Sequence, residues 1–176
     1  MKQQPSRRET IDLLIAGLGN SIRMDDGVGI HAAAVLRKEV EAGWNPAPRG
    51  DLDQLVKIAE IGTSPIDALP LLESARKVIA LDAVQAGGTP GSVYRLKLEA
   101  VRKGGPDTSL HELDLRDALR LLPEERRPEV VVLGVEPACI DFGLELSPAL
   151  HEALPGFLDQ IRRVAAELLR SDDPMQ

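Results

Sequence analysis

Short apolar runs separated by glycine and proline turns predict buried strands along this chain. Residues 13–16, 77–84 and 130–135 are continuous apolar runs bounded by turn residues, as in strands covered on both faces. A further strand is predicted at 55–61. Residues 92–99 alternate Val93, Arg95 and Lys97 with Tyr94, Leu96 and Leu98, which is typical of a half-exposed edge strand.

Helical patterns fill the intervals between these strands. They are predicted at 27–40, 64–72, 111–122 and 147–169. Ser64 fits the N-cap of the second helix, and Pro155 is expected to interrupt or restart the last one. Strands alternating with helices indicate an α/β fold, a three-layer sandwich whose mostly parallel central sheet has one antiparallel edge strand and helices on both faces.

Length and composition predict one globular domain over residues 1–176, with a flexible arm (1–10), a folded part (11–170) and a tail (171–176). Hydrophobic residues make up 43% of the chain, and aromatic residues only 2%. Few aromatic residues and a net charge of −7 argue against nucleic acid as a partner. The single cysteine, Cys139, excludes an intrachain disulfide and a CxxC metal site.

The first residues, MKQQPSRRET, are polar, and the apolar run that follows is interrupted by Asp12. That run is too short for a membrane span and poorly flanked for a signal peptide. We therefore expect a cytoplasmic protein without a membrane segment.

The turn after the first strand is the most informative stretch. Gly17, Gly19 and Asn20 allow a sharp turn and a close backbone approach, and Asp25 with Asp26 stands just before the first helix. Ligands of open α/β sheets bind at the carboxyl ends of the strands, where this turn lies.

Acidic residues recur at the carboxyl ends of the predicted strands. Asp26, Glu60 and Asp82 each lie at or just beyond such an end, and His111 begins a helix that can reach the same edge. Two carboxylates and an imidazole could hold a divalent transition metal with open coordination positions. Such a metal polarises a carbonyl or activates water.

Structural explanations compete with this one. Asp25 and Asp26 could equally well cap the helix or interact with its dipole, and at most one of them is expected to face the site. Asp82 is harder to explain by packing, because burying a charge is costly. His111 alone would more often be a capping or surface residue.

These residues fall within an ordered set of segments that resembles the hydrogenase maturation endopeptidases, which process the large subunit of nickel–iron hydrogenases. The resemblance covers nearly the whole chain, from about residue 12 to 169. It is carried by GLGNSIRMDDGVG (17–29), EIGT (60–63), ALDAVQAGGTPG (80–91), SLHELDLRDAL (109–119) and VVLGVEPACIDFGLELSPAL (131–150).

The resemblance implies a cytoplasmic protease that removes the C-terminal extension of the immature large subunit once nickel has been inserted. It implies that Asp26, Asp82 and His111 contact the metal, nickel, which the substrate or the protease could supply. The attacking water could be activated by that nickel, by a separate metal, or by a carboxylate such as Asp25 or Glu60. The residues expected to shape the cleft and offer backbone donors are Gly17, Asn20, Gly62 and Thr63.

The chain departs from the family pattern at two places. Many relatives have aspartate and glycine where this chain has Glu60 and Ile61, and glutamate is frequent where it has Asp26. The first change leaves the role of Glu60 open, whereas the second shortens the side chain but keeps an oxygen ligand.

Two alternative functions stay open. A peptidyl-tRNA hydrolase-like enzyme also opens with GLGN, but it is expected to continue with Pro-Gly where this chain has Ser21-Ile22. A non-catalytic nickel-binding chaperone would carry the same ligands. The preferred partner is the immature hydrogenase large subunit, with the chain a monomer or weak oligomer.

Overall fold

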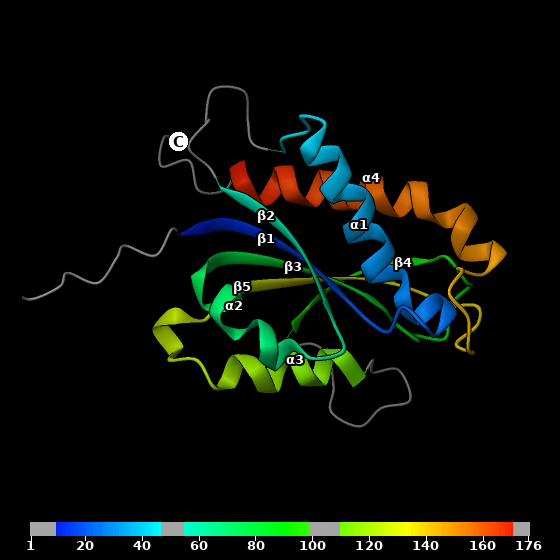
Figure 1. Cartoon of the computed structure of the whole chain (residues 1–176), viewed down its shortest axis with the longest axis horizontal. Coiled ribbons are helices and arrows are strands. Elements are labelled where there is room, and N and C mark those ends of the chain that lie inside the picture. Colours follow the sequence, from blue (N-terminus) through cyan, green and yellow to red (C-terminus); the bar gives the residue numbers. More distant parts are fainter. Residues whose placement is uncertain (1–9, 47–54, 99–109, 171–176) are drawn as a thin grey trace, which may run out of the picture.

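A five-stranded sheet of order β2-β1-β3-β5-β4 forms the centre of the molecule (Figure 1). The computed structural model describes residues 10–46, 55–98 and 110–170, without the side chains of 110–114. The strands are β1 (Ile11–Leu18), β2 (Val56–Gly62), β3 (Ala75–Ala83), β4 (Val93–Lys97) and β5 (Glu129–Val135). The helices are η1 (Met24–Gly27), α1 (Val28–Glu41), η2 (Pro65–Ala68), α2 (Leu69–Ser74), α3 (Leu110–Arg120), η4 (Glu124–Arg126) and α4 (Pro148–Arg170).

The sheet confirms the predicted mixed architecture. β1 pairs in parallel with β2 and β3, and β3 pairs in parallel with β5. β4 is an edge strand that pairs antiparallel with β5. All four parallel strands therefore end at the same edge of the sheet, which we call the carboxyl edge.

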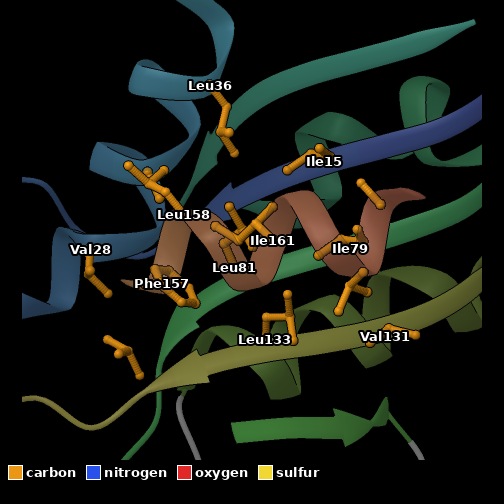
Figure 2. Packing of buried hydrophobic residues seen from close by; sticks show 14 of the residues in the cluster. Ile15, Val28, Leu36, Ile79, Leu81, Val131, Leu133, Phe157, Leu158 and Ile161 are labelled. Carbon is orange, nitrogen blue, oxygen red and sulfur yellow. The ribbon is translucent and has the colours of Figure 1, made fainter. Parts of the chain in front are cut away.

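Helices cover both faces of the sheet, α1 and α4 on one and α2 and α3 on the other (Figure 1). Alternate β1 residues enter different cores: Leu13 and Ile15 belong to the cluster under α1 and α4, and Leu14 and Ala16 to the other. Figure 2 shows the first cluster, where Phe157 of α4 packs among aliphatic side chains of the strands. Aliphatic residues thus build this core, as expected from a chain with few aromatic residues.

Two glycines let α1 lie unusually close to the sheet. A Cβ atom on Gly29 would lie 2.2 Å from the Leu81 carbonyl oxygen and 2.5 Å from that of Leu18. A Cβ on Gly17 would lie 2.5 Å from the Gly29 carbonyl oxygen. Since backbone atoms cannot move aside cheaply, both positions need glycine, and their contact fixes the start of α1 at the carboxyl edge.

One local prediction is wrong. α4 continues through Pro155 without interruption, because Pro155 is exposed and water can satisfy the carbonyl that loses its helical partner. Ser64 is the N-cap residue of η2 and Pro65 lies in its first turn, as predicted, but the Ser64 side chain makes no capping hydrogen bond.

The predicted flexible arm (1–10) and tail (171–176) cannot be compared with the structure. The arm and the tail are outside the described ranges, apart from Thr10. Within those ranges, no helix combines the length and the apolar character needed to cross a membrane.

A pair of identical substitutions tests the close approach of α1 to the sheet. Gly29→Ala should lower the free energy of unfolding by at least about 2 kcal/mol, because its Cβ would overlap two strand carbonyls. Gly156→Ala, in α4 with no atom near the new Cβ, should raise it by up to about 1 kcal/mol through helix propensity. Urea unfolding measures the change in stability of both variants. Equal changes would contradict the close contact between Gly29 and the strands.

Candidate functional site

The turn after β1 folds back on itself and holds Asp26 in place. Gly19 has a φ of 109°, which favours glycine, and its N–H donates to the Gly62 carbonyl oxygen at 3.2 Å. The N–H of Asn20 donates to Asp26 Oδ2 at 3.1 Å, and Asn20 Oδ1 accepts from the Ile22 N–H at 3.1 Å. The ends of β1 and β2 and the Asp26 carboxylate are therefore joined in one turn.

Asp26 and Asp82 come together around Gly19. A Cβ on Gly19 would lie 1.9 Å from the Asp26 carbonyl oxygen and 3.6 Å from Asp82 Oδ1. Asp82 is completely buried, and its Oδ1 accepts a hydrogen bond of 2.9 Å from the Ala83 N–H. The Asp26 backbone and the Asp82 carboxylate thus both lie next to Gly19 at the carboxyl edge, although these two residues are far apart in the chain.

Asp25 points away from this pair into a pocket of donors. Its Oδ2 accepts from the N–H groups of Ala138 and Cys139 at 2.8 and 2.9 Å and from the Ser147 hydroxyl at 2.8 Å. Its Oδ1 accepts from the Ser147 N–H at 2.7 Å. Asp25 has no exposed surface, so its carboxylate joins the turn after β1 to the loop between β5 and α4.

Backbone hydrogen bonds strengthen the same junction. The Gly143 N–H donates to the Ile22 carbonyl at 3.0 Å, and the Gly143 carbonyl accepts from the Met24 N–H at 2.9 Å. The Asp25 N–H donates to the Cys139 carbonyl at 3.3 Å. Met24 has a φ of 44°, rare for a residue with a side chain, so this backbone is held in a specific and costly conformation.

Glu60 is held in an ion pair on the surface. Its Oε1 lies 2.9 Å from Arg37 Nη1 on α1. Among the described side chains, Glu60 forms no metal-sized group with Asp26 and Asp82.

The residues expected to shape the cleft have different surroundings. Gly17 is buried beneath α1 in contact with Gly29, so it contributes packing. Gly62 has a φ of 73° and ends β2 beside the turn after β1. Thr63 is exposed, and Asn20 uses its own N–H to hold Asp26.

The backbone of His111 lies in the first turn of α3, and its side chain lies outside the described residues. α3 leads through a short connection into the start of β5, so α3 begins near the carboxyl edge (Figure 1). Among the side chains that are described, no three His, Cys, Asp or Glu residues form a metal-sized group. The described part of the proposed trio is the Asp26–Asp82 pair.

A third buried acid, Glu136, orders the loop that follows β3. Its carboxylate accepts from the N–H groups of Ala86 at 2.9 Å and Gly87 at 3.3 Å and from the Tyr94 hydroxyl at 2.8 Å. Burial alone would raise the pKa of Glu136, but hydrogen bonds from Tyr94, Ala86, Gly88 and Gly87 outweigh it and lower the pKa. The hydrogen bond to Glu136 in turn raises the pKa of Tyr94.

Comparison with protein families and curated proteins points to one group. A family model described as HycI, hydrogenase maturation protease, matches residues 47–164. The hydrogenase expression/formation protein HupD of Thiocapsa roseopersicina is 26% identical over 152 residues, which are 84% of this chain and 64% of that protein. The protein HoxM of Azotobacter vinelandii is 28% identical over 163 residues, 90% of this chain and 72% of its own length. The chain thus spans just under two thirds of the HupD relative.

A solved structure has the same fold. The hydrogenase maturating endopeptidase HybD from E. coli superposes with a TM-score of 0.72 at 24% identity. The superposition covers 89% of this chain and 93% of that one. At this level of identity, the likeness shows the fold alone.

The hydrogen bonds of Asp25 predict that its charge stabilises the protein. Asp25→Asn should lower the free energy of unfolding by about 3 kcal/mol or more, because an amide NH₂ would face N–H and O–H donors. Ser147→Ala should cost about 1–2 kcal/mol, since it removes one donor and the bond that Leu150 N–H makes to Ser147 Oγ.

The matched control is Asp141→Asn, at an exposed position of the same loop. It should change the free energy of unfolding by no more than about 0.5 kcal/mol. Urea unfolding compares the three variants, and an Asp25→Asn value as small as that of the control would contradict the structural role.

Proposed function

The chain belongs to the hydrogenase maturation protease family, and from that premise we propose that it is an endopeptidase acting on a nickel–iron hydrogenase. Its substrate is the immature large subunit, from which it removes the C-terminal extension after nickel insertion. The observation that carries this proposal is the meeting of Asp26 and Asp82 around Gly19 at the carboxyl edge.

Nickel enters this reaction as part of the substrate. The carboxylates of Asp26 and Asp82 are suitable oxygen ligands for a divalent metal, and His111 is the proposed third ligand. Nickel held there would polarise the scissile carbonyl or lower the pKa of a bound water. A precursor without nickel would offer these carboxylates nothing to bind, which explains why cleavage would wait for metal insertion.

The surroundings of the other acids narrow their roles. The Asp25 carboxylate already accepts four hydrogen bonds, so we assign it to positioning its neighbour Asp26 and not to taking a proton from water. Glu60 is engaged with Arg37 and receives no catalytic role. Either the metal or one of its carboxylate ligands would therefore activate the water.

The turn residues would receive the peptide. Asn20 and Gly62 lie in the linked turns at the ends of β1 and β2, and the exposed Thr63 follows them; their backbone groups would lie along the bound extension. Gly17 would act indirectly, by letting α1 lie close to the sheet. We place the reaction in the cytoplasm, where the large subunit is matured.

The test is an in vitro processing assay with purified protein and three substrates: nickel-loaded precursor, nickel-free precursor and a peptidyl-tRNA. Only the nickel-loaded precursor should become shorter. Asp82→Asn and Asp26→Asn should each lower the cleavage rate by at least about a hundredfold. Glu60→Gln should stay within about twofold of the wild type, because its partner is a surface arginine.

Circular dichroism and urea unfolding establish that each variant is folded. Cleavage of the nickel-free precursor at the same rate would contradict the role of nickel. Nickel-dependent binding of the precursor without any shortening would instead identify a chaperone, and release of tRNA would identify a peptidyl-tRNA hydrolase.

A further inference from the structure

In the part of the chain that the structure describes, large exposed apolar side chains lie mainly around the candidate site. Among the described residues, one of them, Leu121, follows the end of α3 that leads toward the start of β5. The others lie in segments that leave the carboxyl ends of β1, β2 and β5, and they are Ile22, Ile66, Phe142 and Leu144. A single exposed leucine or isoleucine is ordinary on a protein surface, so their grouping at this edge is what requires an explanation.

Three of these side chains come from two segments that lie side by side, and we call them the rim patch: Ile22, Phe142 and Leu144. The backbone hydrogen bonds of Gly143 to residues 22 and 24 form a parallel bridge between Arg23 and Gly143. This bridge places Ile22 next to the segment that carries Phe142 and Leu144. Their exposed fractions are 51%, 82% and 67%, so the patch is open to a partner.

The rim patch stands on a rigid support. The loop that carries Phe142 and Leu144 is the loop whose donors surround Asp25. Gly143 is itself covered by Met24, whose Cγ would lie 2.8 Å from a Cβ at that position. Since the backbone is already held, a partner would lose little conformational entropy in ordering this surface.

We propose that the rim patch binds an apolar segment of the large-subunit precursor and so contributes to substrate affinity. This inference rests on the proposed function, which supplies a polypeptide as the occupant. Its position supports that choice: Ile22 and Asp26 lie in the same turn, so a chain reaching Asp26 and Asp82 passes beside the patch. Two aliphatic side chains and one phenyl ring match apolar side chains in the substrate, whereas Arg23 and Glu145 provide a polar border.

The test compares equally exposed positions inside and outside the patch. Phe142→Ser, Leu144→Ser and their combination are measured beside Leu121→Ser, whose native side chain is 65% exposed at the other end of the sheet. With nickel-loaded precursor, the double variant should raise KM by about tenfold or more and leave kcat within about twofold. Leu121→Ser should leave both constants unchanged, and urea unfolding checks that all variants are folded.

The outcomes separate this inference from the proposed function. If the wild type cleaves the precursor and the double variant has the same KM as Leu121→Ser, the rim patch has no role in substrate binding and the proposed function stands. If the wild type does not cleave the precursor, calorimetric titration measures whether it binds the precursor. Binding by the wild type that is lost in the double variant would support the role of the rim patch, although the proposed protease function would be wrong.

Sedimentation of the wild type and of the double variant tests a second copy of this chain as the occupant. A dimer that the double variant abolishes, together with an unchanged KM, would overturn the proposal. A wild type that sediments as a monomer, with the expected rise in KM, would support it.

Discussion

The buried carboxylate of Asp25 is the constraint on which the candidate site depends. An ionised group without contact to water costs several kcal/mol unless donors surround it, and four donors from the loop after β5 do so here. The residues that it joins are more than a hundred positions apart in the chain. If the turn and the loop separated, the Asp25 carboxylate would lose its hydrogen-bond donors. The contact between turn and loop therefore positions both Asp26 and the rim patch.

The adjacent residues Asp25 and Asp26 consequently have different roles. The Asp25 side chain points into the protein, while the Asp26 carboxylate accepts a hydrogen bond from the Asn20 N–H in the turn after β1. Two glycines allow this close packing. Gly29 lets α1 pack directly against the strands, and Gly19 leaves room for the Asp26 backbone and the Asp82 carboxylate. A parallel sheet brings its strand ends to one edge, and these contacts bring the Asp26 backbone and the Asp82 carboxylate next to the same glycine.

Much of this arrangement could be predicted from local sequence, and the remainder depends on distant partners. Continuous apolar runs marked the buried strands, and the cost of burying a charge singled out Asp82. Adjacent side chains point in different directions, so at most one of Asp25 and Asp26 was expected to face the site, but the donors that hold Asp25 lie in the loop after β5. The ion pair of Glu60 with Arg37 joins two different elements, so local sequence could not reveal it. Glu136 follows a buried strand much as Asp82 ends one, so that signal was present before the structure showed its hydrogen bonds.

The central claim is that Asp26 and Asp82 contact the nickel carried by the substrate. X-ray absorption at the nickel edge measures this directly, with the loaded precursor recorded alone, with the wild-type protein and with Asp82→Asn. The account predicts that wild-type protein adds oxygen ligands to the nickel and that Asp82→Asn adds fewer. A nickel spectrum that is identical in all three samples, under conditions where the complex is shown to form, would contradict it.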